Sequence, residues 1–123
     1  MAKTKPITWM DEPEEHDYPA SVSYLTLHYE EKKAIEITNK LKTAPLVEFK
    51  AKDIYRASAL PLLGISNLHV KRNLKKIKHG EALSPLLLVR DTKTGKLLIS
   101  DGYHRMCAVY TLDEDAFITC KIV

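Results

Sequence analysis

The sequence lacks any apolar run that approaches the roughly 20 residues required to span a bilayer, and its first residues include no hydrophobic stretch typical of a signal peptide. We therefore expect a cytoplasmic protein without a membrane partner. Cysteine is also scarce, since Cys107 and Cys120 are the only two. Two cysteines fit a reducing compartment in which both are small core residues, although their spacing alone leaves a disulfide open.

The sequence has no large excess of positive or negative charge. Nineteen Lys and Arg residues against 16 Asp and Glu give a formal net charge of +3, which is too small to identify a nucleic-acid binder by itself. An apolar fraction of 45% is ordinary for a globular protein. At 123 residues the chain is long enough to bury a core without disulfides.

Residues 1–20 are polar and contain Pro6 and Pro13, so we expect a loosely ordered N-terminal arm followed by a single domain over residues 21–123. Within the arm, Trp9 is expected to dock on the domain or on a second subunit. Because the second of these two positions for Trp9 requires another copy of the chain, a homodimer is one of the alternatives.

The hydrophobic pattern of residues 21–123 predicts an α+β fold, a small mixed sheet with helices packed on it. Leu27, Ala34 and Leu41 recur at a spacing of seven and indicate a first long helix. The first predicted helix has Ser21 or Ser23 as its cap and runs to about Lys42, and further helices are predicted over residues 50–60, 66–79 and from His104. The predicted strands cover residues 46–49, 83–90, 96–100 and 117–123. Turn residues at 91–95 predict that the second and third strands form a hairpin.

A short turn after residues 97–99 ends the third predicted strand and opens a compact, largely apolar helix. Gly102 permits a sharp turn or the close approach of a ligand because it has no Cβ atom. The free N–H groups of the following helix favour an anion at this corner. His104 and Arg105 lie at the helix start and carry the donors that a phosphate requires.

This turn, SDGYHRMCA, resembles the signature turn of the ParB/sulfiredoxin superfamily, in which a Gly-x-[His/Arg]-Arg sequence opens a helix behind a strand. The LSPLLLVR segment is similar to the preceding strand of that superfamily, and FITCKIV is similar to its closing strand. The resemblance covers about Pro45 to Val123 and implies a ParB/sulfiredoxin-like fold. It also implies that the turn and the helix start hold nucleotide phosphates, with ATP or CTP and Mg²⁺ as the expected cofactors.

The residues distinguish only partly among the branches of the superfamily. Tyr103 stands where sulfiredoxins have their catalytic cysteine, and Cys107 lies about one helical turn further on, so sulfiredoxin chemistry is not expected. Partition proteins usually have Gly-Glu-Arg-Arg and a helix-turn-helix domain that has no counterpart here. Free serine kinases carry Asp-Gly-His-His-Arg, the nearest match to residues 101–105, but their larger substrate-binding portion has no evident counterpart.

The residues of the turn have both catalytic and structural interpretations. Asp101 either positions a Mg²⁺-bound water, accepts a substrate proton, or only stabilises the turn. His104 either donates to a phosphate, transfers a proton, or bonds the backbone at the helix start. Arg105 suits bidentate phosphate contacts, and its alternative is a salt bridge to the acidic loop at 113–115.

The predicted nucleotide-binding residues are Gly102, Tyr103, His104, Arg105 and Arg56. Arg56 is included because the superfamily often lines its pocket from the segment after the first strand, and its alternative is a solvated helix face. His104 and Cys107 form one i,i+3 pair, but two further ligands are missing at any recognisable spacing, so no metal site is expected.

A cluster of positive charge lies on the helix predicted over residues 66–79. Its members are Lys71, Arg72, Lys75, Lys76 and Lys78. Such a run is usually a solvated face, but it also suits nucleic acid or a polyphosphate. Three functions are therefore open: a nucleotide- or phosphate-binding domain, with or without phosphotransferase or hydrolase activity; a DNA/RNA-binding or nuclease-like module; and a regulatory interaction domain without turnover.

Overall fold

The computed structural model describes residues 7–123, and within this range the chain forms five helices and four strands. In chain order the elements are α1 (Asp17–Leu25), α2 (Glu31–Thr43), β1 (Val47–Lys50), α3 (Ala51–Ser58), α4 (Leu68–Lys78), β2 (Leu86–Asp91), β3 (Lys96–Asp101), α5 (Tyr103–Leu112) and β4 (Phe117–Ile122). This arrangement confirms the predicted α+β class.

The strands form one mixed sheet in the order β1-β4-β2-β3. β1 pairs antiparallel with β4, β4 pairs parallel with β2, and β2 and β3 form the predicted antiparallel hairpin. Because β2 lies between two other strands and helices cover both faces, Leu86, Leu87, Leu88 and Val89 are all buried. The unbroken apolar run in the sequence is typical of such a strand.

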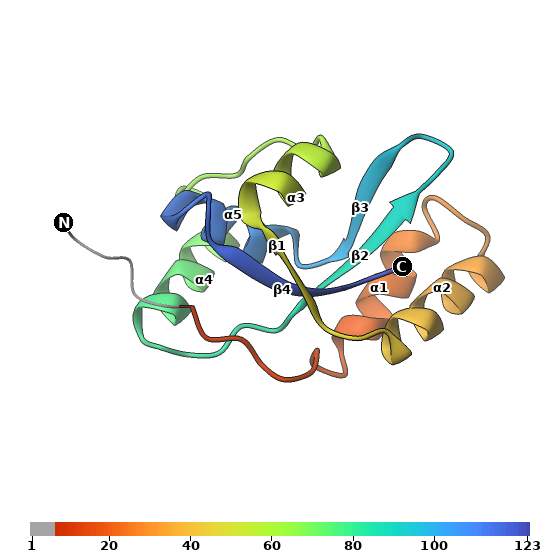
Figure 1. Cartoon of the computed structure of the whole chain (residues 1–123), viewed down its shortest axis with the longest axis horizontal. Coiled ribbons are helices and arrows are strands. Elements are labelled where there is room, and N and C mark those ends of the chain that lie inside the picture. Colours follow the sequence, from red (N-terminus) through yellow and green to blue (C-terminus); the bar gives the residue numbers. More distant parts are fainter. Residues whose placement is uncertain (1–6) are drawn as a thin grey trace.

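Helices cover both faces of the sheet, as Figure 1 shows. α1 and α2 pack on one face, where Leu25 and Leu41 belong to the same core cluster as Leu87. α3, α4 and α5 lie on the other side, where Met106 and Leu86 belong to the larger cluster. Neighbouring residues of β2 enter different clusters because successive side chains of a strand point to opposite faces.

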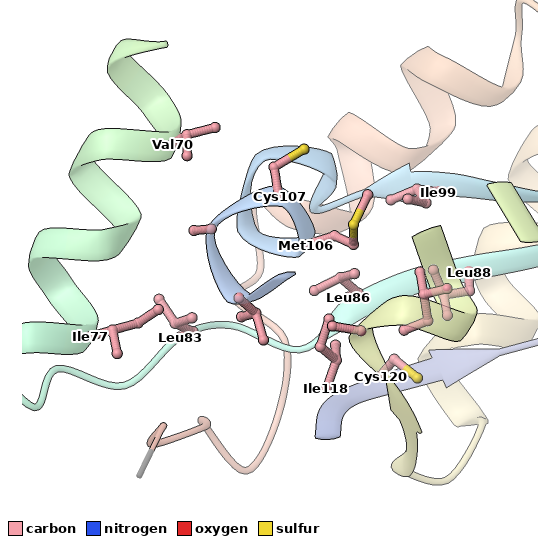
Figure 2. Close-up of a cluster of buried hydrophobic side chains, with 14 residues drawn as sticks. Val70, Ile77, Leu83, Leu86, Leu88, Ile99, Met106, Cys107, Ile118 and Cys120 are labelled. Carbon is pink, nitrogen blue, oxygen red and sulfur yellow. The ribbon is translucent and has the colours of Figure 1, made fainter. Parts of the chain in front are cut away.

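The larger cluster fixes α4 against the rest of the domain. Val70 and Ile77 of α4 point toward the cluster that contains Met106 of α5 (Figure 2), and all three are buried. α4 is capped by Asn67, one residue after the predicted cap, since its side chain accepts hydrogen bonds from the N–H groups of His69 and Val70 at 2.9 and 3.2 Å. These contacts set which face of α4 is turned to the start of α5.

The prediction of a single helix from a cap at Ser21 or Ser23 to about Lys42 is wrong, because the chain forms α1 and α2 with a turn between them. The carbonyl of Leu25 accepts hydrogen bonds from the N–H groups of both His28 and Tyr29, at 2.9 and 2.8 Å, which ends α1 in a tight turn. Leu27 lies in that turn and is 80% exposed. A spacing of seven therefore gave no sign of where the chain turns.

The described part of the N-terminal arm is anchored to the domain, whereas the sequence predicted loose order; residues 1–6 lie outside the described residues. Trp9 forms a parallel β-bridge with Leu83, so it docks on the domain. The N–H of Glu14 donates to the hydroxyl of Ser84 at 3.1 Å. The expected boundary at residue 20 falls inside α1, which begins at the buried Asp17. The proline and charged residues of the arm do not predict these contacts, because the contacts are made with residues far away in the sequence.

Candidate functional site

The turn at Gly102 has the backbone geometry that the sequence predicted. Gly102 is the N-cap residue of α5 and has a φ of +107°, a conformation that other residues rarely adopt. A Cβ atom at this position would lie 2.6 Å from Cγ of Leu86 and 2.9 Å from Nη2 of Arg105. The turn therefore requires glycine both for its φ angle and for the close approach of these two side chains.

The start of α5 opens into a pocket of about 310 Å³. α5 begins at Tyr103, one residue before the predicted start, and Gly102 has no side chain with which to cap it. The first N–H groups of a helix have no intrahelical partner, so they are available to a ligand. The pocket is lined by Asp101, Gly102, Tyr103, His104 and Arg105 from the turn, and by His69, Arg72, Asn73 and Lys76 from α4.

One face of α4 forms the second wall of this pocket. His69, Arg72, Asn73 and Lys76 recur at i, i+3, i+4 and i+7, which places them on one side of the helix. The side chains of Arg72 and Lys76 make no ion pair or hydrogen bond with another described residue. The glycine turn and part of the basic helix, which the sequence presented as alternative sites, therefore share one pocket.

Two histidines meet across this pocket. The ring centroids of His69 and His104 are 4.8 Å apart. Burial lowers the pKa of His104, and the nearby His69 and Arg105 lower this pKa further. His104 is therefore neutral at neutral pH, and it can take up a proton when a bound anion reduces the local positive potential.

Arg105 is held by carboxylates of its own chain. Its Nη2 lies 2.7 Å from Oδ2 of Asp101 and 3.7 Å from Oδ2 of Asp17. The Nε atom is buried and has no hydrogen-bond partner among residues 7–123. The salt bridge to the acidic loop at 113–115, which was the sequence alternative, is not formed; Lys52 pairs with that loop at 2.6 Å.

Asp17 pairs with Arg105, a residue of the pocket lining, and was not among the residues predicted for the site. It is 2% exposed, and its Oδ2 accepts a hydrogen bond from the hydroxyl of Ser84. Next to it, the exposed His16 lies 3.4 Å from Oδ1 of Asp17. The local signal was an aspartate two residues before Pro19, a pattern typical of a helix start. Nothing local indicated its partners, because Ser84 is 67 residues away.

The pKa of Asp101 is raised to about 6. Burial is the main cause and the neighbouring Asp17 adds to it, while Arg105 acts in the opposite direction. A carboxyl group that titrates near neutral pH suits proton exchange with a ligand. Asp101 also lines the pocket, so geometry and acidity both retain it as a candidate for acid–base chemistry.

Tyr103 and Arg56, two of the predicted nucleotide-binding residues, differ in their relation to the pocket. The hydroxyl of Tyr103 donates to the carbonyl of Pro61 and so ties the loop before α4 to the start of α5. Tyr103 still lines the pocket. Arg56 is exposed on α3 and is not among the residues that line the pocket. The structure therefore brings residues 101–105 together with α4 and leaves Arg56 outside.

Cys107 and Cys120 are both free and buried, which answers the disulfide question. Within residues 7–123, no three His, Cys, Asp or Glu side chains are grouped as a metal site requires. Nor does that range include a helix with the length and apolar character needed to cross a bilayer.

No family model, curated protein or solved structure matches the chain, so the ParB/sulfiredoxin resemblance stays a prediction.

Proposed function

We propose that the protein binds the phosphate groups of a nucleotide, or of another phosphorylated ligand, in the pocket between α4 and the start of α5. The proposal rests on one observation: Arg72 and Lys76, which have no carboxylate partner among the described residues, line the same pocket as the turn at Gly102. Phosphate oxygens accept hydrogen bonds both from unpaired cationic side chains and from the N–H groups at a helix start. Their combination is more specific than either feature alone.

His104 and Arg105 have different roles in this proposal. His104 contributes a ring nitrogen, and a proton once the anion is bound. Arg105 shapes the turn and stays with Asp101 and Asp17, because its departure would leave the buried Asp17 and the half-buried Asp101 without their shared guanidinium. The positive charge that meets the phosphates therefore comes from α4.

ATP or CTP with Mg²⁺ remain the proposed cofactors. A pocket of about 310 Å³ is near the lower end of the sizes of small-molecule sites, about 300–1,000 Å³, so it suits the phosphate groups better than a whole nucleotide. Asp101 is the one carboxylate in the lining, and Arg105 pairs with it. Mg²⁺ would therefore be held mainly by phosphate oxygens and water, as is usual for this ion.

We also propose that the pocket carries out a phosphotransferase or hydrolase reaction. Such a reaction needs a base that takes the proton of the attacking hydroxyl or water. We assign this role to Asp101, whose pKa is about 6, and we assign phosphate contact to His104. An interaction domain without turnover would bind the same ligand and show no product.

A thermal-shift panel of ADP, ATP, CDP and CTP, with and without Mg²⁺, tests the proposal, because a ligand that binds only the folded state raises Tm. We expect at least one nucleotide to stabilise the protein. Arg72→Gln and Lys76→Gln should each weaken binding by about tenfold, since each removes a charge-assisted contact. Lys71→Gln and Lys75→Gln are matched controls, with the same kind of charge loss on α4 outside the pocket lining.

Nucleotide binding is excluded if no nucleotide shifts Tm, and the assignment to this pocket is wrong if the changes at Lys75 and Lys76 have equal effects. A functional enzyme additionally requires that Asp101→Asn and His104→Ala reduce turnover. Binding that survives in both variants while product formation is lost would place the two residues in the reaction. Binding without any product from the wild-type protein would favour the interaction domain.

Positive charge on the outer side of α4, away from the pocket, favours nucleic-acid binding as a second candidate function. Lys71 and Lys75 are exposed there, and α4 contains no acidic residue. In a DNA/RNA-binding or nuclease-like module these lysines would contact the nucleic-acid backbone. Each lost contact would then reduce the slope of log affinity against log salt by about one unit. Because Lys76 lines the nucleotide pocket, only Lys71 and Lys75 separate the two functions cleanly.

A further inference from the structure

A second pocket, of about 380 Å³, lies on the sheet face that α3 partly covers. Its floor is formed by Leu88, Leu97 and Ile122 from three neighbouring strands, and Ile54 and Ala57 of α3 form one side. None of its lining residues is shared with the pocket at Gly102. It is therefore a separate feature that the proposed function does not use.

The pocket exists because the apolar pattern of the strands continues beyond the helices that cover them. Leu88 pairs with Ile122 of β4, and the next alternate position of β2 pairs with Leu97 of β3. α3 has only eight residues, and the β2–β3 hairpin rises beside it (Figure 1). At the outer side of this face Phe49 of β1 is 36% exposed, so apolar surface is left accessible.

Arg90 ends the apolar floor toward the hairpin. It follows Leu88 by two residues on β2 and so lies on the same sheet face, directly opposite Leu97 in the β2–β3 register. Arg90 is exposed, and its side chain makes no ion pair or hydrogen bond with another described residue. An unpaired guanidinium beside an apolar floor favours an anionic group on the ligand.

The carboxylates at the rim do not neutralise Arg90. Asp91 is occupied by the hairpin turn, where it accepts hydrogen bonds from the hydroxyl of Thr94 at 2.7 Å and from the N–H of Lys93 at 3.2 Å. Asp53 lies in the first turn of α3, a position in which the helix dipole stabilises a carboxylate. The charge of Arg90, like that of the exposed Lys96 in the same lining, is therefore left for a ligand.

We propose that this pocket binds a small amphipathic anion, with an apolar chain or ring over Leu88, Leu97 and Ile122 and a carboxylate paired with Arg90. The apolar body replaces water on the uncovered floor, and the carboxylate selects among ligands of the same size. The site is independent of the phosphate pocket, so either can exist without the other.

Backbone amide NMR titrations with octanoate, 1-octanol and octylammonium test this site, since the three probes share one chain and differ in charge. We expect saturable shifts at Leu88, Leu97 and Ile122, with octanoate bound most tightly. Arg90→Gln should weaken octanoate by about tenfold and leave 1-octanol unchanged. Lys93→Gln is the matched control, because it removes a cation from the same hairpin outside this pocket.

A second pair of variants tests the location without disturbing the core. Ala57 is exposed on α3 and lines the pocket, so Ala57→Trp should fill it and abolish the binding of octanoate. Arg56→Trp adds the same ring at the adjacent exposed position, outside the lining, and should leave binding intact. Tighter binding of octylammonium than of octanoate, full binding to Ala57→Trp, or no saturable binding would each overturn the proposal.

Discussion

The guanidinium of Arg105 in α5 pairs with the carboxylate of Asp101, four residues earlier at the end of β3, at 2.7 Å between Nη2 and Oδ2. This pairing places Nη2 only 2.9 Å from the position that a Cβ atom would take on Gly102. The arginine of the turn is thus committed within the protein and requires the glycine beside it. In our account Arg105 builds the turn, and Arg72 and Lys76 meet the phosphates.

Gly102→Ala should destabilise the fold by about 3 kcal/mol or more, because it combines an unfavourable φ with overpacking against Leu86. Gly95→Ala is the matched control: Gly95 also has a positive φ, +73°, but a Cβ atom there would meet no atom within 4 Å. It should cost only about 1–2 kcal/mol. Guanidinium chloride denaturation measures both free energies of unfolding, and equal costs would refute the close approach at Gly102.

Arg105→Ala should destabilise the protein by about 3–5 kcal/mol, since it leaves Asp101 and Asp17 next to each other without their shared guanidinium. Arg105→Ala is therefore a poor test of ligand binding on its own. Adding Asp17→Asn should recover part of the loss, with a coupling of about 1 kcal/mol or more in a double-mutant cycle. Strictly additive effects would mean that Arg105 and Asp17 do not interact energetically.

The stability of the wild-type protein relative to Asp101→Asn should fall as pH rises. The pKa of Asp101 in the folded state, about 6, lies above its ordinary value of 3.8, so the folded state binds this proton more tightly than the unfolded chain. The stabilisation by the proton is full below the ordinary pKa and is lost as pH rises through about 6. Urea denaturation of both proteins across this range gives the difference, and a constant difference would contradict the raised pKa.

Ser84→Ala should loosen the N-terminal segment, because it removes the hydrogen bond to Asp17 and the acceptor for the N–H of Glu14. We expect a cost of about 1–3 kcal/mol and faster amide hydrogen exchange at Glu14. Thr94→Ala, which removes an exposed hydroxyl bonded to Asp91, is a control on the far hairpin. Unchanged exchange at Glu14 would show that Ser84 does not anchor the segment.

The fold class and the hairpin were predictable because they depend on patterns that are local in the sequence. The apolar run at 83–90 and the turn at 91–95 determine β2, β3 and their pairing. The sharp turn at Gly102 was predictable from the same kind of local pattern, a strand followed by turn residues and a helix. The N-terminal helices were not predictable, because the exposure of Leu27 depends on a turn that the spacing of apolar residues does not encode.

The wall of the candidate site that belongs to the turn was predictable for the same reason. Residues 101–105 are contiguous, so the turn could be found directly. Its second wall depends on how Val70 and Ile77 pack in the core, which sets the orientation of α4 and separates Lys76 from Lys75. Asp17 escaped the prediction for the same reason, since it reaches the site only through long-range contacts.

An amide NMR titration of the wild-type protein with ATP and CTP, each with Mg²⁺, tests whether the pocket between α4 and the start of α5 binds phosphate groups. We predict saturable shifts that are largest at Gly102, Tyr103 and His104 and at Arg72 and Lys76 on α4. These residues would respond together because they line one pocket. Shifts confined to Lys71 and Lys75 on the outer side of α4, or no saturable shift at Gly102, would show that nucleotides do not bind in this pocket.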